Sequence, residues 1–192
     1  IAYRNKKAMA SASILTYTPP KTPGQIYAFE KTFELVYFWK TFIPSNNTFK
    51  ELSSSGNLNT LKNDSLKYYL FELDKMYVDI ANYEHHMRRE YEQYIYDVAI
   101  PNTDILNFLD FVQIPETGKL KKIDLAKIQP EQVKKMEDEI VWILNNKTLR
   151  NAMRLSVMNN RLLKNKHIDM RKHIERMIEL IDQDLGSNKN KP

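Results

Sequence analysis

The sequence lacks cysteine and contains only four glycines and eight prolines among its 192 residues. Without cysteine there is no disulfide framework, no thiolate zinc site and no thiol catalysis. Scarce glycine argues against turn-rich β architectures and phosphate-cradling loops, and it favours long uninterrupted helices. No apolar run approaches the roughly 18 residues of a membrane span, and no secretory signal is visible. These absences favour an all-α fold and leave the biochemical activity undefined.

Charge of both signs is present, but it is distributed unevenly along the chain. Lysine and arginine number 29 against 24 aspartates and glutamates, which gives a net charge of +5. The segment 57–115 carries a net −5, and the segments before and after it are basic. Nucleic-acid-binding proteins usually concentrate positive charge on one face, so this pattern argues against a nucleic-acid partner. It favours segments that attract one another within one fold.

The strongest periodic signal predicts a long helix over 64–100. Asn63 is a suitable N-cap, and neither glycine nor proline follows until Pro101. Apolar side chains recur at spacings of three and four, which places them on one helix face. A helix of this length would reach about 55 Å. The predicted seam contains Leu66, Tyr69, Leu73, Met76, Ile80, Tyr83, Met87, Tyr91, Tyr94 and Val98.

A second long helix is expected over about 147–185, ended by Gly186. Helix 64–100 carries a net −4 and segment 147–185 a net +4, so the two should pack as an antiparallel pair. Burial of the apolar seams, at roughly 1.5–3 kcal/mol per side chain, outweighs surface ion pairs at about 0–1 kcal/mol. The seam of the second helix is expected to contain Leu163, His167, Met170, Ile174, Met177, Ile181 and Leu185, with Leu149, Met153, Leu155, Met158 and Leu162 covering its earlier turns.

Three shorter helices, at about 25–43, 49–55 and 131–144, are expected to complete an all-α antiparallel helical bundle. Thr48 and Glu51 have capping-box spacing. Asn145 and Asn146 should separate the third short helix from the second long one.

The predicted domain organisation has three parts. Residues 1–24 form the end of a helix that begins before residue 1, followed by a proline-rich linker; residues 25–186 form a single helical-bundle domain. Residues 187–192 form a disordered tail. Within the bundle, 101–129 is an irregular connection with one helical turn at about 105–109.

No residue pattern predicts catalysis, a cofactor or a metal. His85 and His86 are adjacent, and His167 and His173 are six residues apart, so no histidine pair has the spacing of a helical metal site. The sequence contains no Glu-x-x-His motif, no phosphate-binding glycine loop and no nucleophile elbow. We therefore expect a protein that is not an enzyme.

One basic stretch of the second long helix is a candidate interaction stripe. Its side chains could grip phosphates or anionic lipid headgroups. The alternative is the ordinary solvent face of a bundle helix, partly neutralised by its acidic neighbour. The stripe contains Arg150, Arg154, Arg161, Lys164, Lys166, Arg171 and Lys172.

The segment 48–63, with the sequence TFKELSSSGNLNTLKN, resembles a large uncharacterised family of small Bacteroidota proteins. The similarity extends over about 25–185 and includes 42–47 and 178–185. Its centre is the structural motif Gly56, Asn57 and Leu58, which reads as a helix end with Leu58 folding back onto the bundle. The resemblance implies a membrane-spanning helix ahead of this chain and a helical domain in the periplasm. It implies no activity.

The sequence thus leads to a non-enzymatic, membrane-tethered, extracytoplasmic bundle that binds a protein partner as an accessory or assembly subunit. A homo-oligomer is one form that such an interaction could take, and a cytoplasmic location is the alternative to the periplasm. One alternative function is a small-molecule sensor with its ligand held between the helices. The other is binding of nucleic acid or anionic lipid through the basic stripe.

Overall fold

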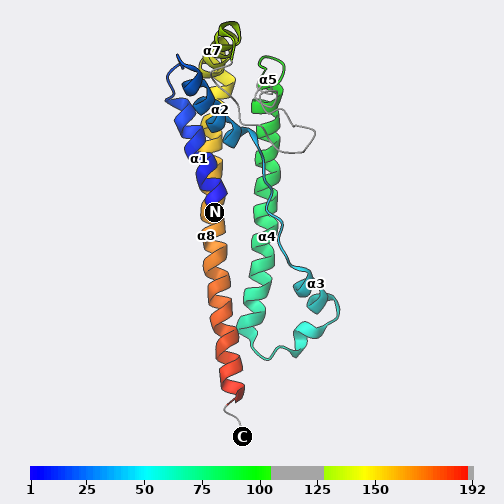
Figure 1. Ribbon diagram of the computed structural model, residues 1–192. Helices are drawn as coiled ribbons and strands as arrows, with labels where there is room; N and C mark the ends of the chain where they lie inside the picture. Colours follow the sequence, from blue (N-terminus) through cyan, green and yellow to red (C-terminus); the bar gives the residue numbers. More distant parts are fainter. Residues whose placement is uncertain (105–127, 190–192) are drawn as a thin grey trace, which may run out of the picture. The chain divides into compact units, whose positions relative to one another are not determined.

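The computed structural model describes residues 1–104 and 128–189, with side chains described up to residue 186 (Figure 1). All secondary structure within these ranges is helical, which confirms the all-α fold class. The turn expected at 105–109 lies outside the described residues. The helical elements are α1 (Ala2–Leu15), α2 (Pro23–Tyr37), α3 (Asn47–Ser54), η1 (Asn57–Thr60), α4 (Asp64–Tyr91), η2 (Glu92–Tyr96), α5 (Asp97–Ala99), α7 (Pro130–Asn145) and α8 (Lys147–Lys189).

The chain divides into two compact units. Unit 1 contains Ile1, Lys40–His86 and Leu162–Pro192, and unit 2 contains Ala2–Trp39 and Met87–Arg161. The boundaries fall inside α4 and α8, so each long helix contributes one part to each unit.

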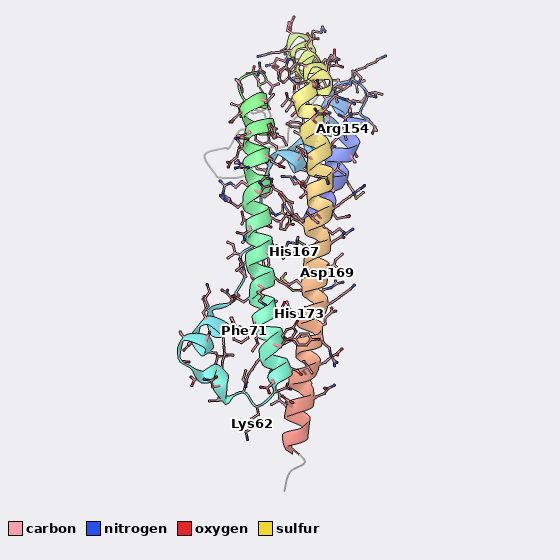
Figure 2. All side chains as sticks on the ribbon, turned by 180° about the vertical axis from the view of Figure 1, so that it is seen from behind. Lys62, Phe71, Arg154, His167, Asp169 and His173 are labelled. Carbon is pink, nitrogen blue, oxygen red and sulfur yellow. The ribbon has the colours of Figure 1, made fainter. Side chains whose placement is uncertain are left out.

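Unit 1 is built on the antiparallel pair of α4 and α8 (Figures 1 and 2). The amide of Asn63 donates to Asp184 Oδ2 at 2.8 Å, and Lys166 Nζ lies 2.6 Å from Asp79 Oδ2. The start of α4 therefore lies beside the end of α8, which is the predicted antiparallel pairing. Buried side chains between the two helices include Leu66, Leu73, Ile80, Leu163 and Met170.

Unit 2 holds a hydrophobic core formed by α1, α2, α7 and the adjoining parts of the long helices. Phe29, Phe33 and Val36 on α2 are at most 1% exposed. The rings of Phe29 and Phe33 stack at 5.9 Å, and Tyr37 stacks on Tyr96 at 4.5 Å. This aromatic row fixes the inner face of α2.

The predicted helix over 25–43 is shorter than expected. It begins at Pro23, whose fixed φ suits a first helical position, and the Thr22 side chain accepts from the Gln25 amide. It ends at Tyr37, because Phe38 is extended and its carbonyl accepts from Lys7 Nζ at 2.7 Å. The Lys7 ammonium therefore occupies the Phe38 carbonyl, which would have accepted a backbone hydrogen bond if the helix continued by another turn.

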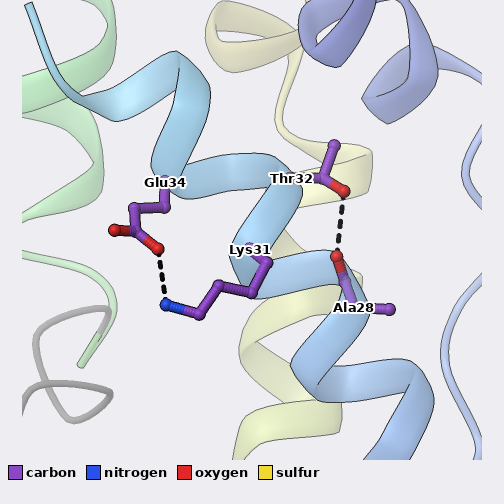
Figure 3. A network of polar contacts seen from close by, with 4 residues as sticks. All are labelled: Ala28, Lys31, Thr32 and Glu34. Carbon is purple, nitrogen blue, oxygen red and sulfur yellow. Dashed lines mark hydrogen bonds and ion pairs between the residues drawn. The ribbon is translucent and has the colours of Figure 1, made fainter.

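Two short-range contacts support the outer side of α2. Lys31 Nζ lies 2.7 Å from Glu34 Oε2, and the Thr32 hydroxyl donates to the Ala28 carbonyl at 2.9 Å (Figure 3). Both members of the ion pair are close to half exposed, so its contribution is about 0–1 kcal/mol. The buried face of α2 contributes most of its stability.

The expected helix 64–100 is helical through Ala99, but it contains a π-helical turn at Glu92–Tyr96. A π turn inserts one residue and shifts the inward face by one position. Ile95 is therefore 2% exposed, whereas Tyr94 is 40% exposed. Tyr83 is exposed as well, so the prediction of Tyr83 and Tyr94 as core residues was wrong.

The short helix α3 begins at Asn47, and its N-cap is Asn46, so the capping box expected at Thr48 was wrong. The left-handed helix end is confirmed: Gly56 has φ 74°, and Leu58 is 7% exposed. None of the residues of α3, including its apolar ones, is buried.

The ends of α7 and of the N-terminal part of α8 match the prediction. Pro130 opens α7, and Asn146 ends it and caps α8 by accepting from the Leu149 amide at 3.0 Å. At the other end, α8 passes through Gly186 to Lys189, so the expected stop at Gly186 was wrong. Gly186 has no positive φ, and without a left-handed turn the helix can continue.

Candidate functional site

The basic stripe is divided between the two units. Its members in unit 2 are Arg150, Arg154 and Arg161, and their surroundings differ from one another. Arg150 donates to the Leu144 carbonyl at 3.0 Å and to the Leu15 carbonyl at 3.5 Å. It thereby satisfies a free carbonyl at the end of α7. Arg154 is exposed and donates to Asn151 Oδ1, and Arg161 is exposed. Figure 2 labels Arg154.

In unit 1 the stripe is partly neutralised. Lys166 pairs with Asp79 at 2.6 Å and lies over the Tyr83 ring at 4.2 Å from its centre. Arg171 lies 3.6 Å from Glu175. The remaining members there are Lys164, which is half-buried, and Lys172, which is exposed. Contacts with α4 and within α8 thus explain the positions of Lys166 and Arg171 without an external ligand.

The histidines have structural surroundings. His167 is 8% exposed and its ring meets the Phe42 ring edge-on at 5.1 Å, while His173 Nε2 lies 2.7 Å from the Tyr69 carbonyl (Figure 2). His85 and His86 are exposed. In the described part of the chain, no group of three or more histidines and carboxylates could hold a metal ion.

Unit 1 contains an apolar groove of about 300 Å³ bounded by α3, α4 and α8. Phe49 and Leu52 come from α3, and the Phe49 ring meets Phe71 of α4 edge-on at 5.7 Å. We call this space the α3 groove. Its other apolar lining residues are Leu70, Leu73, Tyr77, Ile174 and Met177.

The α3 groove also has a few polar lining residues. Asn46 Nδ2 donates to Asp74 Oδ1 at 3.2 Å, and Ser45 and Thr48 complete the polar lining. An apolar interior with a few polar groups is the usual composition of a binding groove. The groove exists because α3 covers the α4–α8 pair without burying any of its own residues.

Apolar side chains also remain exposed near the end of α8. Ile178, Ile181 and Leu185 are 50%, 36% and 58% exposed, and their spacing places them on one helix face. Ile181 and Leu185 were expected in the seam. They lie at the end of the seam. Asp184 contacts Asn63, the residue before α4 begins, so this last part of α8 reaches the beginning of α4 and is poorly covered by it.

In unit 2, α1 and α8 meet through a buried polar strip that the sequence analysis missed. Ser11 and Ser156 share a hydrogen bond of 2.7 Å between their hydroxyls, and Arg4 donates to Asn160 Oδ1 at 3.4 Å. All four side chains, and that of Lys7, are at most 9% exposed. Ser11 pairs with Ser156 and Arg4 with Asn160, while Lys7 donates to the Phe38 carbonyl, and these hydrogen bonds allow the strip to be buried.

The strip also corrects the expected seam of α8. Ser156 and Asn160 occupy the inward positions, whereas Met158 and Leu162 are 59% and 39% exposed and Leu155 is half-buried. The signal in the sequence was the helical spacing of polar residues on both partners: Arg4, Lys7 and Ser11 on one helix, and Ser156 and Asn160 on the other. Apolar periodicity alone does not detect it.

Comparison of the chain with protein-family models, with curated proteins and with solved structures gives no match.

Proposed function

We propose that this chain is a non-enzymatic binding protein that receives apolar side chains of a protein partner in the α3 groove. The observation that supports this most is the groove itself, a space of about 300 Å³ lined mainly by apolar side chains. Protein interfaces concentrate their binding energy in a few apolar or aromatic anchors that enter such spaces. Phe49 and Tyr77 supply aromatic walls, and Met177 supplies an adaptable one.

Exposed apolar residues on the same unit favour a protein partner over a fully enclosed ligand. Ile43 is 85% exposed, Phe71 48% and Ile178 50%, and all three belong to unit 1. Of the three, Phe71 meets the groove residue Phe49 edge-on, and exposed apolar side chains beside a groove are typical of interaction surfaces. A partner that covers them would gain about 25 cal/mol for each Å² of apolar surface removed from water.

A small apolar molecule in the same groove is the second candidate. The groove volume is at the lower end of the range for ligand sites, and Asn46 and Asp74 would orient a polar head. This is the sensor alternative, with the ligand between α3 and the α4–α8 pair.

The membrane tether and the extracytoplasmic location belong to this proposal through the family resemblance alone. Among the helices in the described ranges, none combines the length and the apolar character that a membrane span requires. Binding of lipid or nucleic acid through the basic stripe is less favoured, because Arg150, Lys166 and Arg171 have carbonyl or carboxylate partners.

The test is a capture experiment with a variant that fills the groove. Met177→Trp places an indole in the α3 groove, and Met158→Trp is the matched control on an exposed position of the same helix. Tagged full-length protein is recovered from native membranes at low and moderate salt, and bound proteins are identified by mass spectrometry. We expect one stoichiometric partner that Met158→Trp retains and Met177→Trp loses.

The other outcomes separate the alternatives. If Met177→Trp recovers the same partner as the unaltered protein, the groove is not the binding site. A small molecule detected by native mass spectrometry, and absent from Met177→Trp, would favour the sensor alternative. Recovery of nucleic acid or lipid that moderate salt removes would favour the basic stripe.

A further inference from the structure

The α3 groove is lined by one carboxylate, and that carboxylate has no cationic partner in the described part of the chain. Asp74 is half-buried on α4, and its Oδ1 accepts from Asn46 Nδ2 at 3.2 Å. Among the described residues, no lysine, arginine or histidine forms an ion pair with it. A charge that is partly removed from water is ordinarily compensated by an opposite charge. The groove lining therefore carries a negative charge that these residues do not neutralise.

Cations that are close in sequence to the groove residues are paired with other carboxylates. Lys75 follows Asp74 directly, but its ammonium lies 2.5 Å from Glu72 Oε1. On α8, Arg176 lies 2.6 Å from Glu179 Oε2. The residues three and four positions from Asp74 along α4 are apolar or aromatic, so the helix offers no cation at the spacing of an intrahelical pair. The Asp74 carboxylate is thus available to a cation from another molecule.

The side chain of Asn46 is turned toward Asp74 and does not cap its own helix. Asn46 is the N-cap residue of α3, yet it makes no side-chain capping hydrogen bond. Asparagine is one of the preferred N-cap residues, so a favourable local interaction is given up here. Departures from local preference of this kind are expected at functional sites. The contact fixes one carboxylate oxygen and leaves Asp74 Oδ2 and Asn46 Oδ1 without a hydrogen bond to a described residue.

The other walls of the α3 groove suit a long basic side chain. Lysine and arginine place an aliphatic stem on apolar surface and keep the charged head at a polar group. Leu70 and Leu73 offer such a surface, and the aromatic rings of Phe49 and Tyr77 attract cations. Burial, and next the Asp74 charge, raise the pKa of Tyr77, so the phenol stays neutral. The carboxylate is therefore the charged acceptor of the groove.

We propose that the partner segment bound in the α3 groove carries a lysine or arginine beside its apolar anchors, and that this basic side chain pairs with Asp74. The inference rests on the proposed function and specifies the chemistry of the partner. Ammonium and guanidinium groups only donate hydrogen bonds, whereas Asp74 Oδ2 and Asn46 Oδ1 only accept them. The pair would also give specificity, because a segment with an acidic side chain at this place would be repelled.

The test begins with a phage-displayed library of random peptides, selected on the full chain. Peptides that also bind Met177→Trp are discarded, so that the retained peptides require the groove. The retained peptides are synthesised, and their dissociation constants are measured by fluorescence anisotropy. We expect them to combine apolar or aromatic residues with a lysine or arginine.

Asp74→Asn removes the charge and keeps an acceptor for Asn46. Glu72→Gln is the matched control, because Glu72 lies on the same helix and does not line the groove. We expect Asp74→Asn to weaken peptide binding about tenfold, the typical effect of one lost charged hydrogen bond, and Glu72→Gln to leave it unchanged.

A change in the peptide provides the reciprocal measurement. Replacement of its basic residue with norleucine should cause the same loss on the unaltered chain, and Asp74→Asn should then cause no further loss. If Asp74→Asn does not fold, the norleucine peptide measured on the unaltered chain decides.

The failures of the two proposals are distinguishable. Groove-dependent peptides without basic residues, or peptides that bind Asp74→Asn as tightly as the unaltered chain, would overturn this inference and leave the proposed function intact. If every selected peptide bound Met177→Trp equally well, the proposed function would be wrong, and this inference with it. Phenethylammonium is the probe for a free amine. If it displaced the peptides with an affinity equal to theirs, it would overturn the protein partner and favour the sensor alternative.

Discussion

The two units use their apolar residues differently. Unit 2 gathers its aromatic side chains into a closed core, in which Phe29, Phe33 and Val36 are at most 1% exposed. In unit 1 the seam between α4 and α8 is buried, but α3 buries none of its residues and leaves a groove of about 300 Å³. Both units are helical, so the difference lies in packing and not in secondary structure.

This comparison indicates which unit stabilises the fold and which is available for binding. Closed packing at interior density yields stability and little adaptability. Apolar side chains that remain half exposed add little to folding stability, but their burial by a partner still has its full value. Unit 2 also buries two cationic side chains, Arg4 and Lys7, in its polar strip, whereas the charged residue that lines the α3 groove of unit 1 is Asp74.

The largest expected effect contrasts a phenylalanine from each unit. Phe33→Ala removes a ring that is 1% exposed and should lower the free energy of unfolding by about 3–5 kcal/mol. Phe49→Ala removes a half-buried ring at the α3 groove and should cost less than about 1 kcal/mol. Urea denaturation followed by circular dichroism measures both. Equal losses would contradict the comparison, because they would show that α3 is packed as tightly as α2.

Much of this difference in packing could not be predicted from the sequence. Apolar spacing of three and four predicted both long helices, because the seams provide most of the stabilisation, and their opposite net charges predicted the antiparallel pairing. Spacing does not reveal whether an amphipathic segment such as α3 closes on its neighbour, since that depends on how side chains fit. The α3 groove was therefore not predicted.

Two further misses have local physical causes. The π-helical turn at Glu92–Tyr96 adds one residue to the turn, so the inward position moves from Tyr94 to Ile95. The polar strip pairs Ser11 with Ser156 across two helices, and a search for apolar seams passes over such residues. The basic stripe was predicted from charge alone, and charge does not show that Arg150 binds carbonyls.

The second effect tests the buried charge chemistry of unit 2. Burial, and then the Glu139 carboxylate, raise the pKa of Glu30 to about 8, and Lys31 opposes this shift. The native pKa lies above the unfolded value of 4.5, so the native state binds the additional proton. The stability that Glu30 contributes is thus present at low pH and is lost as the pH rises through about 8.

Glu30→Gln removes this titration and should make the protein more stable than the unaltered chain at pH 9, by about 1–2 kcal/mol. Glu34→Gln is the matched control, because Glu34 is exposed on the same helix and pairs with Lys31. Thermal unfolding from pH 5 to pH 9 measures the difference curve for each variant. A flat difference curve for Glu30→Gln would show that Glu30 is ionised throughout this range.

The smallest effect probes how loosely α3 is attached. Gly56 ends α3 with φ 74°, where alanine is strained by about 1 kcal/mol. Because α3 buries no residue, Gly56→Ala should accelerate amide exchange in Asn47–Ser54 while global stability falls by less than that amount. Gly186→Ala is the opposite case, since Gly186 lies within α8 with open space around its Cα, and alanine there should stabilise the helix by about 0.5–1 kcal/mol. If Gly56→Ala instead destabilised the whole chain by several kcal/mol, α3 would be an integral part of the fold, and the α3 groove would have to be regarded as a packing gap without room for a partner.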